Sequence, residues 1–250
     1  MFVLPSRNLS AALVLLALCA CASSPYNAVP PGNAAASGSA PWELRAPIPA
    51  FTKKSSYLYV ANSFAGKSET GEVDLYAFPL RTKPSPVGAI KTGTYYPLGL
   101  AVDLSGNLYV ANNGASSVTV YPPGGSSPSK TITDGISAPR GIALDTDGTL
   151  YVANYSLSDY LGTVSVYPPG KTSPSYIINY GGCPFGLAVY KHNLYISDAC
   201  DSQIFAVKKG SKTPKSLQLS NISFPLGIGF DSLGNLYVAN ASSDLIDVYP

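Results

Sequence analysis

Few side chains in this 250-residue chain have the types and spacing that acid–base or nucleophilic chemistry needs. His192 is the only histidine, and it follows Lys191 in a predicted hairpin turn. A Ser-His-Asp triad therefore has no other candidate base, and an exposed turn residue is the expected role of His192. No glycine loop that could hold a phosphate precedes a helical pattern. The sequence thus predicts no catalytic residue and no cofactor, and it favours a non-enzymatic protein while leaving the question open.

Amide and carboxylate side chains do recur at one position of a repeated phrase, Leu-Tyr-Val-Ala-Asn. Its copies occupy residues 58–62, 108–112, 150–154, 194–198 and 236–240, and the fourth copy ends in Ile-Ser-Asp. A ring of such oxygens around a channel could hold a divalent metal. A catalytic centre, however, needs different residues in different repeats, and this pattern is nearly uniform. We therefore expect each asparagine to form an Asx-turn hydrogen bond into the loop that follows it, and we predict no metal site.

The spacing of the phrase predicts the architecture. Its tyrosines lie 50, 42, 44 and 42 residues apart. A period in the low forties, carried by short apolar strands without a helical pattern, is typical of a β-propeller in which each repeat is one blade. In the second repeat, turn residues separate four predicted antiparallel strands, at 97–103, 108–112, 118–121 and 130–133. The fold class is therefore all-β: a propeller of four-stranded antiparallel blades with five recognisable repeats.

The second repeat also carries a family resemblance. Its phrases are Pro97-x-Gly99-Leu-Ala-Val-Asp103, Gly106-Asn107-Leu-Tyr-Val-Ala-Asn112 and Ser117-Val-Thr-Val-Tyr121. They resemble the NHL repeat and the YVTN repeat, two related propeller families, and the likeness covers residues 47–250. The resemblance implies a propeller fold. It implies less about function, because these families serve as binding scaffolds and sensors and, in related proteins, as lactonases or lyases.

The propeller domain is expected over residues 43–250, with incomplete first and last repeats. Residues 47–52 are expected to form a degenerate innermost strand of the first repeat. Residues 43–46 would supply the outer strand that the last repeat lacks, and this strand would close a five-bladed ring. The alternative is a fragment of a six-bladed ring, because the resembled families usually have six or more blades. The sequence leaves both arrangements open.

The N-terminal segment predicts export. Residues 1–20 are predicted to form a lipoprotein signal peptide, in which Arg7 precedes an apolar run too short to span a bilayer. The end of the run, Leu18-Cys19-Ala20-Cys21, resembles a bacterial lipobox, which implies a diacylglyceryl thioether on Cys21; an ordinary signal peptide cleaved nearby is the alternative. Residues 21–42, mostly Ala, Ser, Pro and Gly, are expected to form a flexible tether. The protein is therefore expected in the periplasm or at the cell surface, lipid-anchored to a membrane.

Two cysteines in the fourth repeat are expected to pair. If a hairpin turns at Lys191-His192, the numbers of residues paired across it sum to about 383. Cys183 then faces Cys200 at the end of the hairpin away from the turn. Disulfides persist in exported proteins, so we predict a Cys183–Cys200 disulfide, with two free buried thiols as the alternative.

The charge pattern argues against nucleic acid as a partner. Lys+Arg number 16 against 14 Asp+Glu, a net charge of +2, and a protein that binds phosphates normally carries a basic face. The only dense basic stretch contains Lys208, Lys209, Lys212 and Lys215. We interpret it as a solvated turn.

Variation between repeats points instead to an aromatic rim. The turns after the second strand of each blade differ most, and antiparallel geometry places them on one rim with the residues that precede each innermost strand. The candidate ligand-binding residues there are Tyr95, Tyr96, Tyr155, Tyr160, Tyr180 and Phe185. Such a rim could stack on sugar rings or hold a peptide. The sequence thus favours a membrane-tethered extracytoplasmic scaffold that binds a protein, peptide or glycan; the alternative is a metal-dependent, lactonase-like hydrolase using the central channel.

Overall fold

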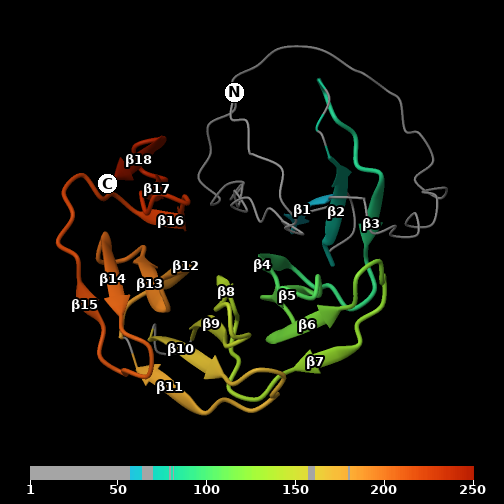
Figure 1. Cartoon of the computed structure of the whole chain (residues 1–250), viewed down its shortest axis with the longest axis horizontal. Coiled ribbons are helices and arrows are strands. Elements are labelled where there is room, and N and C mark those ends of the chain that lie inside the picture. The colour runs from blue at the N-terminus through green and yellow to red at the C-terminus, as the bar shows by residue number, and fades with distance from the viewer. Residues whose placement is uncertain (1–56, 64–69, 79, 81, 157–160, 180) are drawn as a thin grey trace, which may run out of the picture.

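The computed structural model describes residues 57–63, 70–78, 80, 82–156, 161–179 and 181–250. These residues form strands and turns, and none of them lies in a helix. The strands build five antiparallel sheets that follow one another around a common centre (Figure 1). The all-β propeller fold is therefore confirmed.

The three middle blades have four strands each, as predicted. The second blade consists of β4 (Pro97–Val102), β5 (Leu108–Asn112), β6 (Ser117–Tyr121) and β7 (Lys130–Ile132). The third consists of β8 (Ile142–Leu144), β9 (Leu150–Tyr155), β10 (Gly162–Tyr167) and β11 (Tyr176–Asn179). The fourth consists of β12 (Pro184–Tyr190), β13 (Asn193–Asp198), β14 (Gln203–Val207) and β15 (Lys215–Ser216).

The first and last blades show three strands each in the described part of the chain. The first blade consists of β1 (Tyr57–Asn62), β2 (Glu72–Ala77) and β3 (Gly88–Ile90). The fifth consists of β16 (Pro225–Phe230), β17 (Leu236–Asn240) and β18 (Leu245–Tyr249). The two strands expected at 43–46 and 47–52 lie outside the described residues, so closure of the ring stays a prediction.

Apolar side chains fill the spaces between neighbouring blades. Each of the four core clusters combines residues of two consecutive blades; one joins Val164 and Ile178 of the third blade to Leu194 and Ile196 of the fourth. A single blade cannot cover both of its faces, so stacking buries the core. The tyrosines of the repeated phrase share in this packing, and burial raises the pKa of Tyr151 to about 12.

The innermost strands meet at the Pro-x-Gly part of each repeat. In the second blade Pro97 pairs with Asn112 while Leu100 pairs with Val110, a register shift that marks a β-bulge at the two residues between. The same shift occurs in the fourth and fifth blades. A Cβ on Gly99 would lie 2.5 Å from the Arg140 carbonyl oxygen of the next blade. Glycine is therefore required where adjacent innermost strands approach each other.

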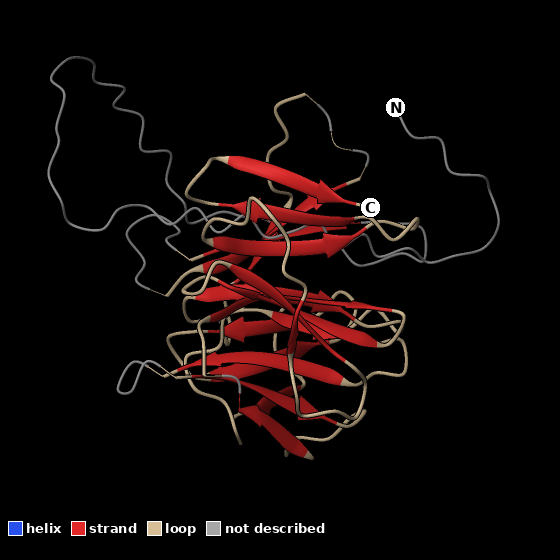
Figure 2. Cartoon of the chain, turned by 90° about the vertical axis from the view of Figure 1, so that its left-hand side faces the viewer, coloured by secondary structure: helices blue, strands red, loops and turns tan. Residues whose placement is uncertain are grey.

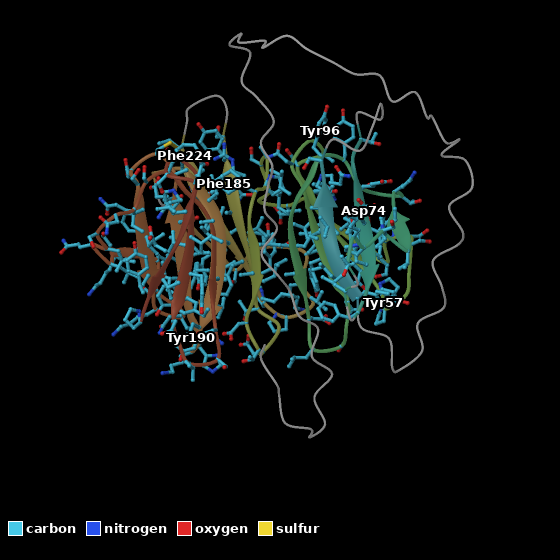
Figure 3. All side chains as sticks on the ribbon, turned by 90° about the horizontal axis from the view of Figure 1, so that it is seen from above. Tyr57, Asp74, Tyr96, Phe185, Tyr190 and Phe224 are labelled. Carbon is cyan, nitrogen blue, oxygen red and sulfur yellow. A yellow bond between two sulfur atoms is a disulfide. The ribbon has the colours of Figure 1, made fainter. Side chains whose placement is uncertain are left out.

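The strands run between two faces of the propeller (Figure 2). We call the face that carries Tyr96, Phe185 and Phe224 the upper face, and the face that carries Tyr57 and Tyr190 the lower face (Figure 3). The residues preceding each innermost strand and the turns after each second strand lie on the upper face. The turns between first and second strands, and between third and fourth strands, lie on the lower face.

Candidate functional site

The recurring asparagines are structural. Asn112 is fully buried, and its Oδ1 accepts a hydrogen bond from the backbone N–H of Tyr95 at 3.0 Å. Oδ1 of Asn154 accepts a hydrogen bond from the N–H of Ser137 at 3.1 Å, and Oδ1 of Asn240 accepts one from the N–H of Ser223. The asparagines thus bond to the loop that leads into the innermost strand of their own blade, whereas the sequence suggested the following loop. The sequence pattern correctly identified a turn-bonding role but not the partner.

The central channel is the main cavity described in the structure. Its volume is about 410 Å³, and the innermost strands β4, β8, β12 and β16 line it. Its walls are mostly apolar, with Leu100, Ile142, Leu187 and Ile228 among the lining side chains. Such a channel suits an apolar or aromatic group entering from one face.

Arg140 and Phe185 stand where the channel meets the upper face, and both line the cavity. The guanidinium carbon of Arg140 lies 3.8 Å from the ring centroid of Tyr155 and 5.2 Å from that of Phe185. A guanidinium stacked on an aromatic ring is held in one plane while its N–H edge can still bind a carboxylate. Two predicted rim residues, Tyr155 and Phe185, therefore meet around an arginine.

Sequence reasoning missed Arg140, although a signal was present. The residue between Pro and Gly in the repeat is Leu98, Arg140, Phe185 or Leu226, so one blade alone carries a charge there. The deviation became informative only when the structure placed Arg140 beside the aromatic rings of two blades.

The other aromatic residues spread along the upper face. Tyr95 and Tyr96 contact each other edge to face, with ring centroids 5.2 Å apart. Tyr95 is 40% exposed and Phe224, before the fifth innermost strand, is 45% exposed. Tyr96 and Phe224 both have φ of +49°, a left-handed backbone that bulky residues rarely adopt. The predicted rim residues Tyr160 and Tyr180 lie outside the described residues.

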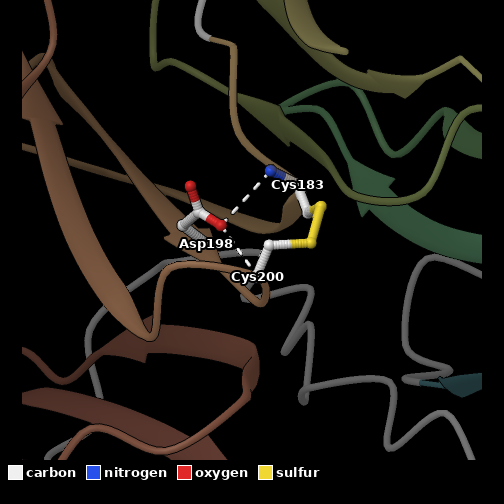
Figure 4. Close-up of side chains that lie close together, drawn as sticks. All are labelled: Cys183, Asp198 and Cys200. Carbon is white, nitrogen blue, oxygen red and sulfur yellow. Dashed lines mark hydrogen bonds between the residues drawn. A yellow bond between two sulfur atoms is a disulfide. The ribbon is translucent and has the colours of Figure 1, made fainter. Parts of the chain in front are cut away.

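Cys183 and Cys200 form a disulfide on the upper face, the pairing that the hairpin register predicted (Figure 4). Their Cα atoms lie 5.4 Å apart. The buried Asp198 lies beside them, and its Oδ1 accepts hydrogen bonds from the N–H groups of Cys183, Cys200 and Asp201 at 3.2, 2.9 and 3.0 Å. The bulge in this hairpin shifts the register by one residue, so Cys183 lies opposite Ala199 instead of Cys200 as the sequence suggested, and the disulfide joins Cys183 to the residue after Ala199.

The described residues fit a metal-dependent hydrolase poorly. The one group of potential metal ligands among them is Cys183, Asp198 and Cys200, in which both sulfurs are already bonded to each other. Asp231 is the only described carboxylate lining the channel, and it accepts hydrogen bonds from Leu233, Gly234 and Asn235 in its own turn. We therefore derive no catalytic step through a metal.

A second cluster of ionisable groups lies on the lower face between the third and fourth blades. Asp145, whose side chain is 1% exposed, accepts a hydrogen bond from Nζ of Lys209 at 2.8 Å, and Nδ1 of His192 lies 2.9 Å from the other carboxylate oxygen. Lys209 also binds Asp147 at 2.6 Å. Burial favours a raised pKa for Asp145, but hydrogen bonds from Lys209, the Thr146 N–H and His192 outweigh it and lower the pKa. His192 is thus a turn residue, as predicted, but with a carboxylate partner that the sequence did not indicate.

We expect Lys209→Met to make the protein more sensitive to acid. The lowered pKa of Asp145 stabilises the fold above the pKa of the unfolded chain, about 4, and this contribution is lost as pH falls through the lowered folded value. Lys209 makes the largest lowering contribution to that pKa, so without it the pKa should be less depressed and acid unfolding followed by circular dichroism should have a higher midpoint pH. At neutral pH the unfolding free energy should fall by about 1–3 kcal/mol. The control is Lys171→Met, an exposed lysine of the same face; equal acid midpoints for the two variants would contradict the prediction.

Comparison with known proteins supports the fold alone. No protein-family model and no curated protein matches the sequence. Among solved structures, a chain of the nidogen/laminin complex superposes with a TM-score of 0.58 at 17% identity, covering 71% of this chain and 67% of that chain. The fold is a β-propeller. A structure of catalytically inactive virginiamycin B lyase from Staphylococcus aureus with quinupristin gives a TM-score of 0.48 at 13% identity, covering 78% and 70% of the two chains.

The described residues include no helix long and apolar enough to cross a membrane. The predicted signal peptide, the predicted tether and Cys21 lie outside the described residues. The NHL and YVTN likeness, the anchor and the ligand therefore stay predictions.

Proposed function

We propose that this propeller is exported, held to a membrane by a lipid on Cys21, and binds a segment of a partner protein or peptide on its upper face. The observation that carries the proposal is that Arg140 contacts the rings of Tyr155 and Phe185 at the mouth of the channel. Aromatic residues and arginine are enriched among the residues that dominate protein interfaces. The disulfide supports export, because such bonds persist in oxidising compartments.

A peptide with a carboxylate fits this site best. The guanidinium of Arg140 lies over the Tyr155 ring, and an arginine placed against an aromatic ring is the residue type that recognises side-chain or terminal carboxylates best. An apolar side chain next to that carboxylate would enter the apolar channel. Tyr95 and Phe224, both partly exposed, can contact the flanking parts of the segment.

We expect Arg140→Met to weaken peptide binding about thirtyfold, equivalent to about 2 kcal/mol for a central interface arginine. Peptides would be selected from a random phage-displayed library on the immobilised full chain, and their dissociation constants measured by calorimetry. Arg140→Lys keeps the charge but loses the stacked plane, so it should bind with intermediate affinity.

The matched control is Lys91→Met, which removes a cation that pairs with Glu72 at 3.3 Å. This variant should bind selected peptides like the unmodified chain, and circular dichroism should show that all variants fold. The proposal is wrong if the selection yields no acidic peptides or if Arg140→Met binds them undiminished. Binding of neutral oligosaccharides alone would favour the glycan alternative.

We expect Cys21→Ser to abolish lipidation. Metabolic labelling of a bacterial host with tritiated palmitate should label the full chain and leave Cys21→Ser unlabelled. Cys19→Ser should still be labelled, because the lipobox resemblance places the lipid on Cys21. Label that survives in Cys21→Ser would exclude this anchor.

A further inference from the structure

The lower face gathers most of the described lysines, although they come from four different blades. They lie in the lower loops or at the lower ends of strands: Lys83, Lys130, Lys171, Lys191, Lys208, Lys209, Lys212 and Lys215. The described carboxylates of this face are Asp103, Asp145, Asp147 and Asp231. Positive charge therefore exceeds negative charge on this face. The upper face has the opposite balance, since it carries Glu72, Asp134, Asp201 and Asp244 against Lys91 and Arg140 among the described residues.

Most of these lysines extend into solvent. The ion pairs recorded between described residues of this face all involve Asp145 and Asp147, and they occupy Lys209 and His192. Lys191 and Lys212 lie along aromatic rings, with Nζ atoms 5.0 Å from the Tyr190 centroid and 5.6 Å from the Tyr176 centroid. Their ammonium groups thus lie over aromatic rings, and both lysines remain exposed to solvent.

Leucines project from the same face. Leu104 and Leu233 occupy the turns after β4 and β16 and are 83% and 84% exposed, the largest values among the exposed apolar residues described. Phe78 and Val87, in the loop between β2 and β3, are 42% and 39% exposed. A turn needs no leucine at its tip for folding, since the neighbouring Asp103 and Asp231 already bond the backbone of these turns.

We propose that the lower face docks on an anionic phospholipid surface. Lysines around projecting leucines are the combination that interfacial binding uses: the charges attract anionic headgroups, and the apolar side chains enter the boundary with the acyl chains. The lysines are distributed over turn tips instead of lining a groove, so they suit a broad charged surface. An acidic protein or polymer would pair with the lysines but would not bury the leucines. Docking by this face would turn the upper face away from the membrane, whether or not that face binds a peptide.

The test places a tryptophan at the expected contact. The chain has one tryptophan, so Trp42→Phe provides a silent background. Leu104→Trp and Leu233→Trp in the full chain report on the lower face, and Phe224→Trp reports on the upper face. With vesicles of phosphatidylcholine and phosphatidylglycerol, emission of both lower-face probes should shift to the blue and be quenched by brominated acyl chains. Vesicles of phosphatidylcholine alone, or high salt, should weaken the effect.

A triple variant tests the role of the charges. Each lysine near an anionic surface contributes about fivefold to binding, so Lys191→Gln, Lys208→Gln and Lys212→Gln together should raise the lipid concentration at half-maximal quenching about a hundredfold. The same three residues changed to arginine should preserve quenching. Unchanged emission of Leu104→Trp with anionic vesicles, or quenching of Phe224→Trp instead, would overturn the proposal. A response to dextran sulfate but not to vesicles would also overturn it and would indicate an acidic polymer as the partner.

Discussion

The variant Gly141→Ala should lower the free energy of unfolding by about 3 kcal/mol. A Cβ on Gly141 would overlap the carbonyl oxygen of Phe185 and lie 3.1 Å from the Leu187 backbone nitrogen and 3.2 Å from Gly186 Cα. All three atoms belong to the backbone of β12 or its bulge, so no side chain can rotate away. The third and fourth blades would have to separate, and separation would loosen the core between them.

Urea unfolding followed by far-ultraviolet circular dichroism measures this effect. The matched control is Gly170→Ala, because that glycine has φ of +71° but nothing within 4 Å of an added Cβ. Gly170→Ala should therefore lose only the free energy of backbone strain, about 1 kcal/mol. If the free energy of unfolding of Gly141→Ala is no lower than that of Gly170→Ala, the close contact between innermost strands does not explain the glycine at position 141.

Removal of the disulfide should have a similar effect. The double variant Cys183→Ala, Cys200→Ala opens a loop with a sequence separation of 17, for which the entropy of loop closure predicts a loss of about 3 kcal/mol. The hydrogen bonds of Asp198 to both ends of the loop should keep the hairpin native-like once the cross-link is gone. Folding should therefore survive with a lower urea midpoint.

Reductant provides the control for this prediction. Dithiothreitol should lower the urea midpoint of the unmodified chain to that of the double variant, and it should leave the double variant unchanged. Peptide maps prepared with and without reductant should differ by the fragment that joins Cys183 to Cys200. Equal midpoints for the oxidised chain and the double variant would show that the bond contributes nothing to stability.

Much of the fold could be predicted from the sequence because its determinants are local. The alternation of apolar strands and Asp/Gly turns repeats within each blade, and the predicted strand at 108–112 coincides with β5. The hairpin register also follows from the chain, since Leu187 pairs with Ile196 as expected. The β-bulge at Pro-x-Gly could not be predicted, because the alternation of apolar residues within a blade does not show where the backbone of the next blade approaches.

The candidate site was predicted only in part. The sequence predicts Tyr155 as an aromatic residue of a variable turn and Phe185 as an aromatic residue at the entry to an innermost strand, but this reasoning passes over Arg140, which contacts both. The sequence predicts His192 as a turn residue without a partner, whereas the stacking of two blades brings its Nδ1 within 2.9 Å of an Asp145 carboxylate oxygen. Contacts between blades depend on how far each sheet rotates and shifts against the next, and no local pattern carries that information.

The sequence by itself therefore determined the repeat, the strands, the turn-bonding asparagines and the cysteine pair, all of which arise within one blade. Only the tertiary structure decided which side chains of different blades meet. It placed an arginine against two aromatic rings at the channel mouth and brought lysines as far apart as Lys83 and Lys215 onto one face. The physical reason is that each blade buries its apolar faces only against its neighbours, so the packing between blades sets the position of every turn.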